Sequence, residues 1–441
     1  MASRAVVIGG GISGLASAWR LSGLGHAVTL IEAEDGLGGL ATTFPWRHTH
    51  LERFYHCILP GDAPLLRIIE ELGLSGDLVW RETGMGFVHG GRLRPLNTAL
   101  DLLGFTPLPL ADRVRMGLMG LRMRAATPDL GLDDVPVAAW IEKQAGPRAL
   151  QTLWRPLLES KVGDRYRDLP ALWLASRLAR EKNTKQEVKG CLRRGYRSLI
   201  GAFEAGLRRR GVEIRTGTRV EAIERRGEAM AVRFPGGSEA FDFAVATLPL
   251  VQFQQVTRGL DLDPSIASLP LDYQGVVCGV FLTRKPLSRW YWVPVVDSGA
   301  TCQGIVEMSN LLPPERTQGL HLAYLVNYTH RTSEFFRRSD EDLLAAYRRD
   351  LATLFPKAAD TVVEQYLFRA PFVEPLWPLG YTRLRPPTTI LPGRLYLACT
   401  AQVYPNVNAW SSCCEVVESM MPALAAETAA PQPAAAVAGT R

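Results

Sequence analysis

Three glycines with the spacing Gly-x-Gly-x-x-Gly constrain the fold of this chain more than any other feature of its sequence. Gly9, Gly11 and Gly14 follow an apolar run at residues 4–9 and open a helical pattern at residues 13–24. In such a unit the first glycine permits a tight turn, the second lets the backbone approach a pyrophosphate, and the third lets helix and strand pack closely. The helix N-terminus presents N–H groups and a positive dipole to the phosphates. A dinucleotide site is therefore predicted, against the alternative of glycines that only turn a strand into a helix.

An acidic residue narrows the choice of dinucleotide. Residues 27–32 read as a second strand, so the opening of the chain is a βαβ unit. This strand ends in Glu32, where a carboxylate can bind both hydroxyls of a ribose. A carboxylate disfavours a 2′-phosphate at the same position, so FAD or NAD is favoured over NADP.

A second glycine group follows the acidic strand. Gly36, Gly38 and Gly39 lie in the segment EAEDGLGGLATTF. This segment resembles the double-glycine stretch of the FAD-dependent amine oxidase superfamily, which implies FAD and not NAD. The arginine that usually follows the glycine pair in that superfamily is absent, because Leu40 and Ala41 stand there.

Further segments resemble one branch of the superfamily, the protoporphyrinogen-oxidase-like flavoproteins. They are LERFYHCI at 51–58, WRPLLESKVGD at 154–164 and LYLACTAQVYP at 395–405, with GVEIRTGTRVEAIE and FDFAVATLP between the last two. The resemblance covers most of residues 4–420 in the right order. It implies an α/β fold (α+β overall), with a Rossmann-type FAD-binding domain and an inserted substrate domain of antiparallel sheet plus helices.

The domain prediction divides the chain into interleaved pieces. Residues 1–60, 190–260 and 385–425 are assigned to the FAD-binding domain, and 61–189 and 261–384 to the substrate domain. The Ala- and Pro-rich tail, 426–441, is predicted to be disordered.

The resemblance implies non-covalent FAD and a set of residues that bind it. Val220 is expected to bind the adenine through its backbone, within a strand pair, and the start of the last helix is expected to face the flavin. The predicted FAD-binding residues are Gly9, Gly11, Ser13, Gly14, Glu32, Gly38, Gly39, Leu40, Val220, Thr247, Thr400, Ala401, Asn408 and Trp410.

The start of the last helix departs from the branch. An acidic-Arg-Gly run is usual there, and residues 406–410 read Asn-Val-Asn-Ala-Trp instead. Either the flavin site is reshaped for an unusual substrate or its affinity for flavin is weakened. The first interpretation is preferred, because the N-terminal half of the site is intact.

Three residues are candidates for catalysis. His56 could act as a general base near neutral pH, with a structural histidine as the alternative. Lys161 could bind an anionic substrate group or hold a water near the flavin, with an exposed helix-end lysine as the alternative. Tyr55 lies beside His56 in the segment that is expected to reach the flavin.

A second set is assigned to the substrate. Glu52 and Arg53 follow the double-glycine segment, and aromatic residues could wall the pocket, although aromatic residues are more often part of a core. The predicted substrate residues are Glu52, Arg53, Trp154, Trp377 and Tyr404.

The composition of the chain limits the kinds of partner that we expect it to bind. The formal charge of +6 is spread over mixed acidic and basic residues, and no nucleic-acid motif accompanies it. The seven cysteines lack CxxC spacing, and the seven histidines form no HExxH motif, so we expect neither a disulfide framework nor a metal site.

A cytoplasmic monomer or homodimer is expected. Residues 95–125 are predicted to form a substrate-domain helix pair, with a peripheral membrane-binding face as the alternative.

The expected function is an FAD-dependent oxidoreductase. It would take a hydride from a CH–CH or CH–N bond of an amphipathic or anionic small molecule in a biosynthetic pathway. The alternatives are a non-redox flavoenzyme of the sugar-nucleotide mutase type and a flavin-free binding protein that resembles the GDP-dissociation inhibitors.

Overall fold

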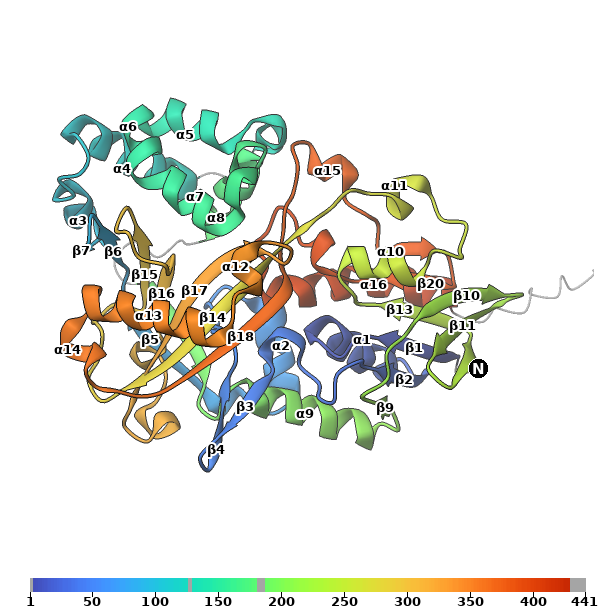
Figure 1. Ribbon diagram of the computed structural model, residues 1–441. Coiled ribbons are helices and arrows are strands. Elements are labelled where there is room, and N and C mark those ends of the chain that lie inside the picture. The colour runs from blue at the N-terminus through green and yellow to red at the C-terminus, as the bar shows by residue number, and fades with distance from the viewer. Residues whose placement is uncertain (1–2, 126–128, 181–186, 429–441) are drawn as a thin grey trace, which may run out of the picture.

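The computed structural model describes residues 3–125, 129–180 and 187–428. A six-stranded, mostly parallel sheet occupies one end of the molecule (Figure 1). Its order is β19 (Thr389–Leu391), β20 (Leu395–Leu397), β13 (Phe243–Ala246), β1 (Arg4–Ile8), β2 (Ala27–Ile31) and β9 (Glu213–Arg215). Only β19 runs antiparallel to its neighbour. With α1 (Ile12–Gly23) between β1 and β2, the predicted βαβ unit is confirmed.

A seven-stranded sheet occupies the other end (Figure 1). Its order is β18 (Val362–Pro375), β14 (Tyr273–Thr283), β17 (His321–His330), β16 (Gly304–Glu307), β15 (Trp292–Val296), β6 (Gly86–His89) and β7 (Arg92–Pro95). All of its pairings are antiparallel except β15 with β6. The predicted antiparallel sheet is confirmed, and so is the α/β fold class with its inserted sheet and helices.

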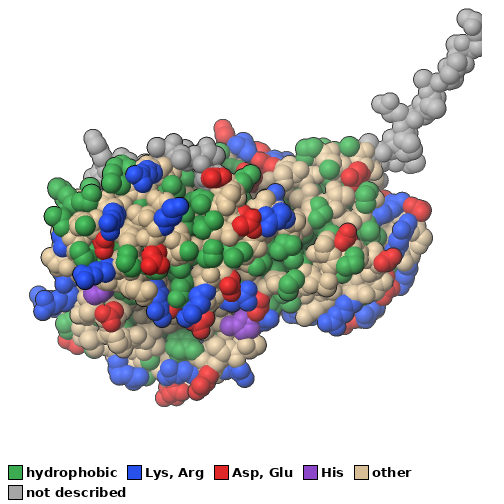
Figure 2. Space-filling view, turned by 90° about the horizontal axis from the view of Figure 1, so that it is seen from above, with side chains coloured by type: hydrophobic (Ala, Val, Ile, Leu, Met, Phe, Trp, Pro, Cys, Tyr) green, Lys and Arg blue, Asp and Glu red, His purple; other side chains and the backbone are tan. Residues whose placement is uncertain are grey.

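A cluster of helices lies above the seven-stranded sheet in Figure 1. It contains α3 (Ala99–Leu103), α4 (Leu110–Ala125), α5 (Val137–Ala145), α6 (Pro147–Ala149), η4 (Leu150–Trp154), α7 (Arg155–Val162) and α8 (Ala171–Arg180). Residues 95–125 therefore form the predicted helix pair, α3 and α4. Figure 2 looks onto this side of the molecule, where hydrophobic side chains alternate with Lys and Arg.

The remaining elements connect these units. The small sheets pair β3 (Thr43–Trp46) with β4 (Thr49–Glu52), β5 (Leu78–Thr83) with β8 (Glu187–Leu192), and β10 (Ala222–Arg226) with β11 (Ala229–Phe234) and β12 (Gly237–Phe241). The other helices are α2 (Ala63–Glu71), α9 (Tyr196–Arg209), α10 (Leu250–Val256), α11 (Pro264–Ala267), α12 (Glu334–Arg337), α13 (Asp340–Leu354), α14 (Pro356–Ala359), α15 (Tyr381–Leu384) and α16 (Trp410–Thr428), together with the 3-10 turns η1 (Gly39–Ala41), η2 (Ser75–Asp77), η3 (Leu130–Asp134), η5 (Gly163–Arg167), η6 (Met308–Asn310), η7 (Pro314–Thr317) and η8 (Thr400–Gln402).

Two predicted boundaries need correction, and the rest of the domain division stays a prediction. The helix α2 was expected in the substrate domain, but Leu65, Ile68 and Ile69 pack into the core of the six-stranded sheet. Three residues assigned to the tail, 426–428, belong instead to α16, whose Leu424 is buried in the same core. The other tail residues, 429–441, lie outside the described part of the chain.

Within the described ranges, no helix is long and apolar enough to cross a membrane. The same part of the chain contains no group of three or more His, Cys, Asp or Glu side chains that could hold a metal ion.

Candidate FAD and substrate site

The first glycine loop is closed so tightly that side chains cannot enter it. Gly9 has a φ of +107°, a conformation that glycine adopts readily. A Cβ on Gly14 would lie 1.8 Å from the carbonyl oxygen of Gly9, so α1 can start here only with glycine at this position. Thr247 fixes the loop from β13, because its hydroxyl donates to the carbonyls of Ile8 and Gly9 at 2.9 and 3.2 Å.

The second glycine segment lies directly against the first. The amide of Gly38 donates to the carbonyl of Gly10 at 2.8 Å. A Cβ on Gly39, which has a φ of +56°, would lie 3.2 Å from the Cα of Gly11. The Leu40 side chain packs against the core of the seven-stranded sheet, so only its backbone is placed to serve a cofactor. The two bare backbone segments and the N-terminus of α1 are a cradle of the kind that a diphosphate requires.

Glu32 stands at the carboxyl end of β2, beside this cradle. Its Oε2 accepts from the amide of Gly10 at 2.6 Å, and its Oε1 accepts from the amide of Glu34 at 2.8 Å. Each carboxylate oxygen has a second lone pair that can accept from a ribose hydroxyl. Glycine loop, helix N-terminus and carboxylate together fit the diphosphate and ribose of FAD.

The predicted environment of Val220 is wrong. The strands on either side of it, β9 and β10, belong to different sheets and do not pair with each other. Val220 lies in the loop between them, two residues after Thr218, whose amide donates to the carbonyl of Glu32 at 2.9 Å. The loop thus reaches the ribose end of the cradle without forming the expected strand pair.

The remaining FAD-binding candidates lie in η8 and around the start of α16, except Ser13, which is buried on α1. The hydroxyl of Thr400 donates to that of Tyr273 at 3.4 Å, and the carbonyl of Ala401 accepts from the Tyr381 hydroxyl at 2.9 Å. These bonds tie η8 to β14 and α15.

The altered segment before α16 is firmly held. The Trp410 ring packs edge-on against Tyr196, with centroids 4.9 Å apart, and 5.8 Å from the ring of His56. The Asn408 amide donates to the carbonyl of Val373 near the end of β18. The N-terminus of α16 is therefore joined to both α9 and the seven-stranded sheet.

His56 is not a base that titrates near neutral pH. Its Nδ1 lies 3.0 Å from the carbonyl of Phe54, which only accepts, so Nδ1 carries the proton and Nε2 is an acceptor. Burial lowers the pKa of His56 to about 4. The imidazole is therefore neutral at physiological pH, and the expectation of a base near pH 7 is corrected.

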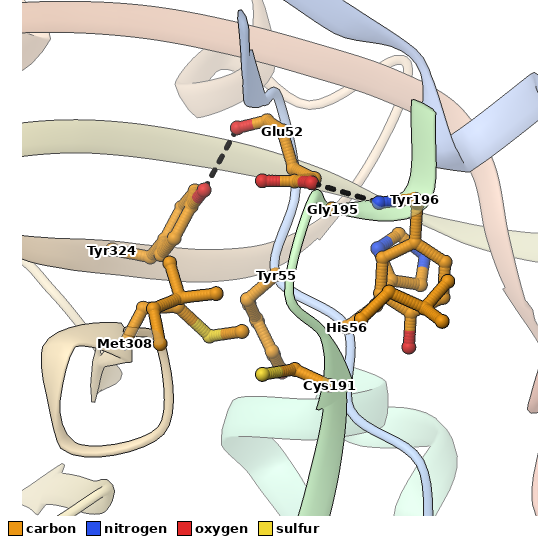
Figure 3. A pocket seen from close by; sticks show the side chains of 10 residues that line it. Glu52, Tyr55, His56, Cys191, Gly195, Tyr196, Met308 and Tyr324 are labelled. Carbon is orange, nitrogen blue, oxygen red and sulfur yellow. Dashed lines mark hydrogen bonds between the residues drawn. The ribbon is translucent and has the colours of Figure 1, made fainter. Parts of the chain in front are cut away.

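A small cavity lies between β4, β8 and η6 (Figure 3). Its volume of about 10 Å³ is close to the minimum for one water molecule, so it cannot hold an organic substrate. The lining residues are Glu52, Tyr55, His56, Cys191, Leu192, Gly195, Tyr196, Met308, Leu312 and Tyr324.

Glu52, predicted to contact substrate, is instead part of a buried ion pair. Its Oε2 lies 3.0 Å from Nη2 of Arg316, and the two side chains are 7% and 9% exposed. Its Oε1 also accepts from the amide of Tyr196 at 3.1 Å. A carboxylate with these partners joins β4, α9 and η7, so its role is structural.

Two of the aromatic residues that were predicted to line the substrate pocket also belong to the hydrophobic core. Trp377 is 2% exposed and packs against Tyr404 with the two rings tilted and their centroids 5.5 Å apart. The Tyr404 hydroxyl donates to the carboxylate of Asp133. Arg53 is exposed, with its guanidinium over the Phe368 ring. Trp154 remains a substrate candidate, because it is half-buried and lies seven residues before Lys161, on the same face of the helix.

The clearest polar group between the helical cluster and the seven-stranded sheet surrounds Lys161, which lies on α7. Its Nζ lies 3.1 Å from Oε2 of Glu374 and 3.7 Å from the centroid of the Tyr328 ring. The Tyr328 hydroxyl lies 2.9 Å from that of Tyr55. The Lys161 side chain is 20% exposed, so it is not the exposed helix-end lysine of the alternative interpretation.

The two tyrosines remain protonated over the physiological range. Burial raises the pKa of Tyr328 to about 12 and that of Tyr55 well above its usual value. They can therefore orient a ligand by hydrogen bonding but cannot act as phenolate bases.

Glu374 and Tyr328 are not among the residues predicted from the sequence. Glu374 is the only charged residue in the apolar run PFVEPLWPLG at 371–380, and this isolation was the available signal. A single charge inside a buried stretch is rarely found without a partner.

The site combines a backbone cradle for a diphosphate, the Glu32 carboxylate for a ribose, and an inserted antiparallel sheet. These features define the class of FAD-dependent oxidoreductases. The chain belongs to the family of flavin containing amine oxidoreductases, whose model matches residues 12–401.

Its relatives carry oxidase names. It is 28% identical to the coproporphyrinogen III oxidase of Propionibacterium freudenreichii subsp. freudenreichii over 169 residues, which cover 36% of this chain and only 31% of that protein. It is 22% identical to the chloroplastic protoporphyrinogen oxidase of Nicotiana tabacum over 411 residues, which cover 81% and 73% of the two chains.

Solved structures share the fold. The cyclohexylamine oxidase of Brevibacterium oxydans IH-35A superimposes with a TM-score of 0.72 at 14% identity, over 97% of this chain and 99% of that chain. An oxidoreductase from Methanosarcina mazei gives a TM-score of 0.73 at 18% identity, over 95% and 100%.

Proposed function

We propose that this protein uses FAD to remove a hydride from a CH–CH or CH–N bond of an amphipathic small molecule. The observation that carries the proposal is the backbone cradle of Gly11 and Gly39 beside Glu32, where a Cβ on Gly39 would lie 3.2 Å from the Cα of Gly11. Bound FAD supplies the hydride acceptor, so few protein side chains are needed for the electron transfer itself.

The protein would contribute position and exclusion of water. The N-terminus of α16, at Trp410, contacts the ring of His56 on one side. On the other side, Asn408 contacts the end of β18, next to Glu374. A substrate held between these elements would meet the neutral donors Tyr55 and Tyr328 and the Lys161–Glu374 pair.

The relatives support an oxidation of this type. Their names include coproporphyrinogen III oxidase, protoporphyrinogen oxidase and zeta-carotene desaturase, and the family match favours a redox enzyme over a mutase or a flavin-free binding protein. An amphipathic substrate suits the mixture of apolar and arginine side chains in the helical cluster. The charge of Arg177, for example, lies close enough to Tyr328 to lower the pKa of that tyrosine.

The proposal is tested by reconstitution and anaerobic reduction. Purified protein should bind one FAD per chain, and the yellow absorbance should bleach without oxygen when a substrate is added. A suitable panel is coproporphyrinogen III, protoporphyrinogen, zeta-carotene, cyclohexylamine and putrescine, the compounds in the names and titles of similar proteins. A colourless protein that takes up no FAD contradicts the proposal.

We further propose that α4 contacts an anionic lipid surface. Leu110, Val114, Leu118 and Leu121 recur at helical spacing and are 62%, 46%, 46% and 59% exposed. The exposed Arg115 and Arg122 lie on the same helix (Figure 2 shows this side). An apolar stripe flanked by arginines is the pattern of a helix that lies in a membrane interface.

A further inference from the structure

Glu374 has an unused hydrogen-bonding atom in the interior. The side chain is 5% exposed, and its Oε1 is buried without a hydrogen-bond partner among the described residues. A buried carboxylate oxygen without a donor costs free energy unless a ligand satisfies it. Its other oxygen, Oε2, faces Lys161 at 3.1 Å.

The Lys161–Glu374 pair carries no net charge. Lys161 is further held over the Tyr328 ring, 3.7 Å from its centroid. An anion that approached Lys161 would meet the Glu374 carboxylate, and a cation that approached Glu374 would meet the Lys161 ammonium. The group is therefore best matched to an uncharged hydrogen-bond donor.

The pair lies beside the elements that would hold the reacting end of a substrate. Glu374 follows Val373, whose carbonyl accepts from Asn408 just before α16. On the other side, Tyr328 contacts the Tyr55 hydroxyl at 2.9 Å, and Tyr55 precedes His56, whose ring contacts Trp410. Glu374 is thus linked to the N-terminus of α16 through its neighbour Val373 on one side, and through Lys161, Tyr328, Tyr55 and His56 on the other.

We propose that Oε1 of Glu374 accepts a hydrogen bond from an uncharged N–H group of the substrate. Such a group is found on a heteroaromatic or conjugated nitrogen, which fits a C–H bond next to nitrogen. Glu374 is then a specificity-determining residue, and Lys161 is a positioning residue that holds the carboxylate in place through its 3.1 Å contact. This inference rests on the proposed function and narrows its substrate class.

The test measures ligand binding to oxidised holoenzyme through changes in the flavin spectrum. The probes are indole, 1-methylindole, which lacks the N–H, benzoate and benzylammonium. The wild type should bind indole at least about tenfold more tightly than any of the other three, the ratio expected for one hydrogen bond to a charged acceptor.

Variants that remove one charge of the Lys161–Glu374 pair distinguish a role in ligand specificity from a purely structural role. Glu374→Gln leaves Lys161 unpaired and should raise the affinity for benzoate at least about tenfold, while the preference for indole over 1-methylindole falls. Lys161→Met leaves Glu374 unpaired and should raise the affinity for benzylammonium instead. A merely structural pair would give no such opposite shifts.

A matched control lies on the same strand. Glu364→Gln breaks the ion pair with Arg47 at the far end of β18 and should leave all four affinities unchanged. If Glu374→Gln fails to fold, the Lys161→Met result alone decides, because its gain of benzylammonium binding requires the Glu374 carboxylate to face the ligand.

The outcomes distinguish this inference from the function on which it rests. Holoenzyme that binds FAD but shows equal affinity for indole and 1-methylindole, or no response to any probe, overturns the inference alone. Protein that takes up no FAD contradicts the proposed function and, with it, the inference.

Discussion

The carboxylate of Glu52 and the guanidinium of Arg316 form an ion pair at 3.0 Å inside the protein, and Glu52 also lines the small cavity in Figure 3. Arg316 also donates to the carbonyls of Arg194 and His50, at 2.8 and 3.1 Å. The pair therefore joins β4, η7 and the turn before α9, three segments far apart in the sequence.

Removing one member of this pair should destabilise the protein strongly. Arg316→Met leaves the buried Glu52 charge without its partner, which typically costs about 3–5 kcal/mol of unfolding free energy. Urea unfolding measures the loss. Arg208→Met, which breaks the exposed pair with Glu204, is the control and should cost less than about 1 kcal/mol. Equal effects of the two variants would show that the Glu52–Arg316 pair is not buried as described.

Gly14→Ala should abolish cofactor binding. The added Cβ would lie 1.8 Å from the Gly9 carbonyl, so the start of α1 must move away from the cradle. We expect bound FAD per chain to fall by at least about tenfold, the ratio that corresponds to 1.4 kcal/mol. The matched control is Gly36→Ala, because no atom lies within 4 Å of a Cβ at Gly36. Unchanged FAD content in Gly14→Ala would refute the cradle.

One buried carboxyl group lowers the stability of the folded protein as the pH rises toward neutrality. Glu307 is 1% exposed, and burial raises its pKa to about 7. The native state then binds more protons than the unfolded state between the ordinary pKa of about 4.5 and pH 7, so this residue lowers stability as the pH rises through that window, by about 3 kcal/mol in all.

Glu307→Gln should remove this dependence. The difference in unfolding free energy between pH 5 and pH 7.5 is measured by urea titration for both proteins, and the wild type should lose about 2 kcal/mol more than the variant. Parallel pH profiles would mean that Glu307 titrates as an exposed carboxyl does.

His56 should make the opposite contribution. Its pKa of about 4 lies below the ordinary 6.5, so the folded protein binds fewer protons, and the stability present above pH 6.5 is lost as the pH falls toward 4. His56→Phe keeps an aromatic ring against Tyr196 and Trp410 but cannot titrate. Acid unfolding followed by circular dichroism should show a shallower loss of stability below pH 6.5 in the variant. An equally steep loss would argue that the imidazole is not buried.

The lipid contact is tested on α4. Leu118→Asp with Leu121→Asp places two charges in the exposed stripe and should reduce co-sedimentation with phosphatidylserine vesicles by at least about tenfold, without a change in melting temperature. Leu24→Asp, at a 53% exposed leucine after α1, is the control. The proposed contact would be contradicted if the wild type did not bind the vesicles, or if the double variant bound them as strongly as the wild type does.

Short-range signals made the cofactor half of the site predictable. The spacing of Gly9, Gly11 and Gly14, and the position of Glu32 at a strand end, follow from local backbone requirements that the sequence displays directly.

The substrate half depends on contacts between distant segments. Glu374 meets Lys161 across more than two hundred residues. The isolated charge of Glu374 in an apolar run indicates that it has a buried partner, but no nearby residue identifies that partner as Lys161. Glu52 and Tyr404 were assigned to the substrate because they occur in the right motifs. Their partners, Arg316 and Asp133, lie far away in the sequence and make both residues structural.

The most direct test of the account is the flavin content and anaerobic reduction of the purified protein. We predict one FAD per chain, released on denaturation because it is not covalently bound, and bleaching of the bound flavin by a substrate that carries a C–H bond next to an uncharged N–H. A protein that stays colourless after incubation with FAD, although its fold is intact by circular dichroism, would contradict the central claim.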